Sequence, residues 1–181
     1  MGFTKKLAGL AAVAVSVMGI GGSALAADYN WTFQTSETAG EPGFVNKQKW
    51  AENVGTLSGG RIDIEILPIG SVVPHTDTLE AVGAGILQGH LTDPSYFSGK
   101  DPAFAMMGNL VGAWSDPFEL LGFMESGGGN ELYAELVEPY GVQFIGASAT
   151  EPEAFVSGVP IRTVEDLKGV KLRAPEGMVQ K

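Results

Sequence analysis

The sequence predicts an α/β fold built on a parallel sheet, and three neighbouring segments carry this prediction. Tyr29, Trp31 and Phe33 alternate with polar residues, which is the period-two pattern of a strand. Segment 44–57 has apolar residues at helical spacing and is followed by Ser-Gly-Gly, which stops a helix. Segment 61–66 alternates cleanly again. Two strands joined by a helical crossover form a βαβ unit, whose strands run parallel.

Short helices and strands are expected to continue the alternation beyond this unit. The periodicity predicts helices over 77–82, 119–124, 130–137 and, as a single turn capped by Thr163, 164–168. It predicts strands within 89–96 and over 142–145, 154–156 and 170–173. Residues 97–112 are rich in Gly, Pro and Met and show no clear period, so this stretch is expected to be irregular.

Residues 1–26 have the pattern of a secretory signal peptide. Lys5 and Lys6 precede an apolar run over 7–20, which is too short to cross a bilayer, and residues 24–26 form an Ala-x-Ala cleavage site. The alternatives are a buried helix or a membrane anchor, but the order of these features is that of an export signal. We therefore expect an exported chain that starts near residue 27.

The charge and the cysteine usage exclude several kinds of partner and site. The leader holds two of the eleven basic residues and none of the twenty-one acidic ones, so the rest of the chain, with nine against twenty-one, has a formal charge of −12. Such an acidic chain is a poor partner for nucleic acid or for an anionic membrane. The chain has no cysteine, which excludes disulfides, thiolate metal sites and a cysteine nucleophile.

No pattern in the sequence predicts catalysis. The glycines within 83–89 follow a helical pattern instead of a strand, unlike a dinucleotide-binding loop. His75 and His90 lack the spacing of a metal motif, and residues 146–150 lack the last glycine of a nucleophile elbow. These observations favour binding over chemistry.

Arg173 is a candidate ligand-binding residue. It lies at the end of the predicted strand 170–173, and open α/β sheets bind their ligands at strand ends. A guanidinium group offers two parallel hydrogen bonds to a carboxylate. The local sequence alone favours a structural salt bridge over ligand binding for this residue.

Several segments together resemble one family of transport proteins. They are SGGR at 58–61, LEAV at 79–82, YFSGKDPAF at 96–104, GGGNELY at 127–133 and TVEDLKGVKLRAP at 163–175. In this order they resemble the DctP-type solute-binding proteins of tripartite ATP-independent periplasmic (TRAP) transporters. The branch that the chain most resembles binds 2-oxo acids and related monocarboxylates.

The resemblance implies an α/β fold of the type II periplasmic binding protein class, with two lobes that close around a hinge. Residues 27–147 would form the first lobe, and residues 148–181 the crossing segment and the start of the second lobe. Members of the family are longer, so the chain is expected to be an N-terminal fragment with a truncated second lobe.

The resemblance also assigns roles to individual residues. It implies that Arg173 grips the substrate carboxylate and that Tyr96 lines the pocket, although Tyr96 can equally be a core aromatic. Relatives carry a Gln-Gly-Gly-Trp stretch, whose Gln helps to hold a cation, where this chain has Glu151 and Glu153. These carboxylates can hold a sodium or calcium ion that bridges to the substrate, or they can be surface charges, so no cofactor is assigned.

The resemblance implies a periplasmic binding subunit that is not an enzyme. It would capture a small organic acid and deliver it to TRAP permease membrane subunits, which use an ion gradient. A homodimer of the complete parent is an open possibility. Two alternatives stay open: an exported α/β hydrolase-type enzyme, which would show turnover, and a ligand-sensing receptor subunit, which would lack neighbouring permease genes.

Overall fold

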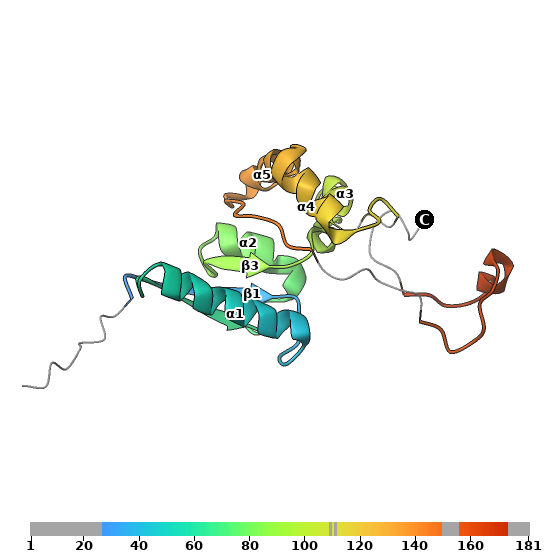
Figure 1. Ribbon diagram of the computed structural model, residues 1–181, viewed down its shortest axis with the longest axis horizontal. Coiled ribbons are helices and arrows are strands. Elements are labelled where there is room, and N and C mark those ends of the chain that lie inside the picture. Colours follow the sequence, from blue (N-terminus) through green and yellow to red (C-terminus); the bar gives the residue numbers. More distant parts are fainter. Residues whose placement is uncertain (1–26, 109, 111, 150–155, 174–181) are drawn as a thin grey trace, which may run out of the picture.

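The computed structural model describes residues 27–108, 110, 112–149 and 156–173 (Figure 1). The strands are β1 (Tyr29–Thr35), β2 (Ile62–Leu67) and β3 (Gly89–Leu91). The α-helices are α1 (Pro42–Leu57), α2 (Thr78–Gly83), α3 (Ala103–Met107), α4 (Pro117–Ser126) and α5 (Gly129–Val137). The 3-10 helices are η1 (His75–Asp77), η2 (Pro94–Phe97), η3 (Glu138–Tyr140) and η4 (Val164–Leu167). The predicted leader lies outside the described residues.

The sheet is parallel, as predicted. Its strand order is β2-β1-β3, and β1 pairs in parallel with both neighbours. The register places Tyr29 opposite Ile62 in β2 and Phe33 opposite Gly89 in β3. Gly89 is required at its position, because a Cβ atom added there would lie 2.4 Å from the ring of Phe33. The carboxyl ends of the strands therefore meet at one edge of the sheet.

Helix α1 covers one side of the sheet and buries the first of two cores. This core comprises Phe33, Phe44, Ala51, Ile64 and Ile66. The helix begins two residues before the predicted start. The reason is Pro42, which suits the first helical position. Its fixed φ fits the helix, and an N–H group at this position would have no intrahelical partner in any case.

The remaining α-helices lie on the β3 side of the molecule, with α2 next to this edge strand and α3, α4 and α5 beyond it (Figure 1). They enclose a second core of buried side chains, namely Leu79, Phe97, Phe104, Met124, Tyr133 and Val137. The predicted helices at 77–82, 119–124 and 130–137 are confirmed as α2, α4 and α5. The predicted strand within 89–96 is confirmed as the short β3.

The prediction that residues 97–112 are irregular is wrong for α3. This helix has five residues, too few to show a helical period in the sequence. Its formation follows from burial of Phe104, whose ring packs edge-on against Phe97 at a centroid distance of 5.6 Å. Tertiary packing therefore sets this helix, while its local pattern is uninformative.

The strands predicted over 142–145 and 170–173 are wrong, because neither segment is a strand in the structure. A strand needs a neighbouring edge with which to exchange backbone hydrogen bonds. Side chains of Val142 and Phe144 instead pack against the second core. The predicted strand at 154–156 lies mainly outside the described residues.

The single turn predicted before Arg173 is confirmed as η4. Thr163 caps it, and the carboxylate of Asp166 accepts hydrogen bonds of 2.9 Å from the backbone N–H groups of Arg162 and Thr163. These bonds lower the pKa of Asp166, because they favour its charged form.

Among the described helices, none is long and apolar enough to cross a membrane.

Candidate functional site

The carboxyl ends of β1 and β3 border a large cavity of about 2190 Å³. Ser36 and Glu37 follow β1, Thr92 and Asp93 follow β3, and all four line the cavity. Trp114 lines it from the segment before α4. We call these five residues the strand-end site. Open α/β sheets bind ligands at the carboxyl ends of their strands, so this is the part of the cavity best placed for a ligand.

The rest of the cavity is a mainly apolar groove. Both β3 and residues 141–149 contribute to its lining. Trp31, Phe33 and Trp50 line the groove with their aromatic rings. The ring centroid of Phe33 lies 6.3 Å from that of Trp31 and 6.0 Å from that of Trp50. The groove is suited to apolar contacts, and the strand-end site adds polar groups to the lining.

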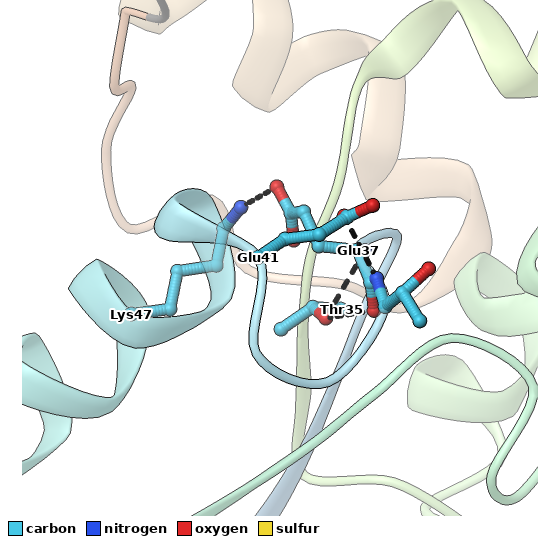
Figure 2. Close-up of polar contacts among 5 residues, drawn as sticks. Thr35, Glu37, Glu41 and Lys47 are labelled. Atoms are coloured by element: carbon cyan, nitrogen blue, oxygen red, sulfur yellow. Dashed lines mark hydrogen bonds and ion pairs between the residues drawn. The ribbon is translucent and has the colours of Figure 1, made fainter.

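Glu37 is held by contacts from three directions (Figure 2). Its backbone N–H donates to Oγ1 of Thr35 at 3.2 Å, and its carbonyl accepts from the N–H of Ile69 at 2.9 Å. Its carboxylate forms an ion pair through Oε1 with Lys47 of α1. In the same loop, the N–H of Thr38 donates to Oε2 of Glu41 at 3.0 Å. The loop after β1 is therefore fixed on both sides of Glu37.

Three polar atoms of the strand-end site are buried without a hydrogen-bond partner in the described part of the chain. They are Oε2 of Glu37, Oγ1 of Thr92 and Nε1 of Trp114. A fourth such atom, Oδ1 of Asn130, belongs to a residue that does not line the cavity. A buried polar atom without a partner costs about 1–3 kcal/mol. Their residues line one cavity through other atoms, so these three atoms are unsatisfied groups behind its wall.

His90 also lines the cavity, but it is an uncharged structural residue at neutral pH. Its Nδ1 lies 2.9 Å from Oγ1 of Thr78, whose hydroxyl donates to the carbonyl of His75 at 2.9 Å. Because that hydroxyl proton is already used, Nδ1 is the donor and Nε2 carries the lone pair. Burial lowers the pKa of His90 to about 4.

Of the four predicted site residues, the structure describes Arg173 and Tyr96. Arg173 is exposed, follows η4 and lines the same cavity as the strand-end site. Tyr96 lies in η2, packs edge-on against His75 at 4.6 Å and is not among the residues that line the cavity. Glu151 and Glu153 lie outside the described residues.

The described residues do not supply a metal site. Within ranges 27–149 and 156–173, apart from the undescribed positions, no three His, Asp or Glu side chains come together in a way that could hold an ion. The predicted ligands Glu151 and Glu153 are not described, so the described donors do not fit a cation by themselves.

Sequence reasoning missed Glu37, Thr92 and Trp114. The first two had a usable signal, because polar residues that directly follow neighbouring parallel strands converge at one sheet edge. Trp114 had none, since it comes from an irregular segment whose position depends on the helices around it.

Comparisons with known proteins give a consistent family. A family model described as bacterial extracellular solute-binding protein, family 7, matches residues 33–181. The crystal structure of a TRAP periplasmic solute-binding protein from Rhodobacter sphaeroides, in an apo open state, is 51% identical, with a TM-score of 0.69 over 82% of this chain and 47% of that chain. A TRAP solute-binding protein from Colwellia psychrerythraea is 25% identical, with a TM-score of 0.53 over 62% of this chain and 34% of that one.

A curated relative points the same way. The monocarboxylate 2-oxoacid-binding periplasmic protein of Nostoc sp. is 29% identical over 153 residues, which are 80% of this chain and 40% of the relative. The chain thus spans less than half the length of these relatives. The resemblance drawn from the sequence motifs is confirmed, and the chain belongs to the bacterial extracellular solute-binding proteins of family 7.

Proposed function

We propose that this chain is the ligand-capturing part of a TRAP transporter's periplasmic subunit and that its solute is a small organic acid. The Nostoc relative is named for monocarboxylate 2-oxo acids, and the Colwellia structure contains pyruvate and calcium. Export through the leader at 1–26 and delivery to permease membrane subunits belong to the same proposal, as does a homodimer of the complete protein. Proteins of this family bind solutes, and the proposal includes no chemical step.

The observation that carries this proposal is that Arg173 and the strand-end site line one cavity. The guanidinium group is exposed and carries a positive charge that attracts an anion. A carboxylate can accept two parallel hydrogen bonds from it, which fixes both the position and the orientation of the acid. The residues of the strand-end site line the same cavity and are available to contact the rest of the solute.

Tyr96 and the cation have weaker support. Tyr96 follows Asp93 and Pro94, which line the cavity, so we keep it as a proposed wall residue. An ion held by Glu151 and Glu153 is consistent with the calcium of the Colwellia structure. Because those two residues are not described, no part of the binding mechanism passes through an ion.

The proposal is tested by measuring binding of pyruvate, lactate and succinate by titration calorimetry. The protein is the chain itself, beside a hybrid completed with the remaining part of the Rhodobacter sphaeroides relative. We expect at least one acid to bind the hybrid. Substitution Arg173→Ala should abolish that binding and leave the melting temperature of the unliganded protein nearly unchanged.

The matched control is Arg162→Ala. Arg162 has the same charge and lies in the same exposed segment, but it does not line the cavity. This variant should bind as the unchanged protein does. Undiminished affinity in Arg173→Ala would show that the arginine is not the carboxylate clamp. A folded hybrid that binds none of the acids would contradict the proposed function itself.

A further inference from the structure

The outer edge of β2 has no neighbouring strand in the described part of the chain, because β2 ends the sheet and pairs with β1 alone. Backbone groups of successive strand residues point alternately to the two sides of the strand. The carbonyl of Arg61 accepts a hydrogen bond of 3.0 Å from the N–H of Tyr29 in β1. The N–H of Ile62 instead donates to Oγ of Ser58 at 3.1 Å. The even-numbered residues of β2 therefore direct their backbone groups away from β1.

Ile64 and Ile66 present these backbone groups at the free edge. Each residue is only 8% exposed, and both side chains belong to the first core. Both residues nevertheless line a groove of about 920 Å³. Because their side chains point into the core, the part that they present to the groove is the backbone.

The features that commonly block a free strand edge are missing from β2. The strand has six residues, contains neither proline nor lysine, and keeps an unbroken register with β1. Short strands, prolines, lysines and bulges are the usual means by which proteins prevent the pairing of an edge with another chain. The edge of β2 is therefore open to the addition of a strand.

The groove leaves room for side chains of an added strand. Its helix side is formed by Ala51 and Gly55 of α1, and Gly59 and Gly60 line it after the helix. These four residues carry small side chains or none. Side chains on the core-facing side of an added strand would enter this space, and it is suited to apolar residues of moderate size.

The charge along the edge selects among possible partners. Asp63 and Glu65 are exposed, line the groove and alternate with the buried residues of β2. Cross-strand pairs of opposite charge are stabilising, whereas like charges placed opposite each other are destabilising. A second copy of β2 is disfavoured, because an antiparallel pairing centred on Ile64 sets Asp63 opposite Glu65 twice.

We propose that the free edge of β2 binds an extended segment of another protein in which basic and apolar residues alternate. The segment adds as a strand, with main-chain hydrogen bonds to Ile64 and Ile66 and basic side chains beside Asp63 and Glu65. This site is distinct from the cavity that contains Arg173. The two share no lining residue, and β2 and β3 are opposite ends of the sheet.

The test uses the chain itself and a fluorescently labelled synthetic peptide of sequence KVKVKVK. Fluorescence anisotropy gives its dissociation constant, and NMR follows the hydrogen exchange of individual amides. At a peptide concentration of about ten times the dissociation constant, exchange at Ile64 and Ile66 should slow about tenfold. The amides of Asp63 and Glu65 face β1 and should exchange slowly with or without peptide, which shows that the sheet is folded. Absence of binding, or protection of β3 alone, would overturn the proposal.

Two control peptides separate strand addition from attraction between charges. EVEVEVE can form the same main-chain hydrogen bonds but carries the opposite charge. KVKPKVK keeps the basic residues, but its proline interrupts the main-chain hydrogen bonds. We expect neither peptide to protect Ile64 and Ile66. If KVKPKVK binds as tightly as KVKVKVK, the attraction is purely electrostatic and the added strand is refuted.

A charge-reversed variant tests the partner chemistry. Asp63→Lys combined with Glu65→Lys should weaken the binding of KVKVKVK by about tenfold or more and should allow EVEVEVE to bind. The matched control is Glu131→Lys combined with Glu135→Lys, at exposed positions of α5, which changes the net charge equally. This control should bind KVKVKVK as the unchanged protein does, and an equal loss in both variants would overturn the assignment to the edge of β2. If the first variant does not fold, Asp63→Asn combined with Glu65→Gln serves the same test with a smaller expected loss.

Discussion

The side-chain amide of Gln34 donates a hydrogen bond of 2.8 Å to the backbone carbonyl of Val73, although the two residues are 39 positions apart. Its Oε1 also accepts from the N–H groups of Val72 and Val73, at 2.8 and 3.2 Å. Gln34 is fully buried. A single side chain at the end of β1 thus replaces a strand as the hydrogen-bonding partner of the segment that follows β2.

Replacing Gln34 with Leu should destabilise the protein. The substitution removes three hydrogen bonds to the backbone groups of Val72 and Val73, and each such bond contributes about 0.5–1.5 kcal/mol to stability. Urea denaturation measures the free energy of unfolding. The control is Gln48→Leu, on an exposed position of α1, which should change it by less than about 0.5 kcal/mol. Equal stability of the two variants would contradict the role of Gln34.

His90 should make the stability depend on pH. Its pKa is about 4 in the folded chain and 6.5 in the unfolded chain, because burial disfavours the charged ring. Between these values the unfolded chain binds more protons, so this contribution is fully present above pH 6.5 and is lost as the pH falls toward 4. The full effect is about 3 kcal/mol.

This dependence is measured as the free energy of unfolding in urea at pH 4.5 and pH 7. Other groups also titrate in this range, so the quantity of interest is the difference between the unchanged protein and His90→Gln. The variant should show a shallower fall at low pH. A matched variant, His75→Gln, leaves His90 in place and should retain the steeper fall. Identical slopes in all three proteins would refute the assignment.

Gly83 should not tolerate a side chain. A Cβ atom at this position, the last residue of α2, would lie 2.0 Å from the carbonyl oxygen of Tyr140. Backbone must move to relieve that clash, so Gly83→Ala should destabilise the protein by about 1–3 kcal/mol. The control is Gly99→Ala, because a Cβ atom there meets nothing within 4 Å. Thermal unfolding followed by circular dichroism should show a lower melting temperature for Gly83→Ala alone.

Asp116 should contribute to stability as the cap of α4. Its Oδ1 accepts a hydrogen bond of 2.7 Å from the N–H of Phe118. Loss of such a cap typically costs about 1 kcal/mol, so Asp116→Ala should unfold at a lower urea concentration. Asp116→Asn keeps a side-chain oxygen at the same position and should retain most of the stability. If Asn and Ala are equally destabilising, the charge matters more than the hydrogen bond.

The elements that the sequence predicted correctly are those with a clear local period. The alternation at Tyr29 and Phe33 and the helical spacing in α1 arise within single segments, so they are visible without the rest of the fold. The wrong predictions concern segments whose structure depends on the rest of the fold. Helix α3 is too short to show a period, and the segments 142–145 and 170–173 have the composition of strands but form no ladder in the structure.

Part of the candidate site was predictable from the sequence, and part was not. The role of Arg173 stays a prediction from its motif, and the structure adds that the residue lines the same cavity as the strand-end site. Glu37 and Thr92 follow strands, so their convergence was predictable from the parallel topology. The role proposed for Tyr96 stays a prediction, since the cavity lining does not include this residue.

The sequence by itself determined the parallel βαβ unit, the presence of the longer helices and the family. These depend on periodicity and motifs, which are local properties of the chain. Only the tertiary structure decided that Oε2 of Glu37 and Nε1 of Trp114 are buried without a partner among the described residues, and that both residues line one cavity. Whether a polar atom has a partner depends on every segment packed around it, and no local pattern in a sequence contains that information.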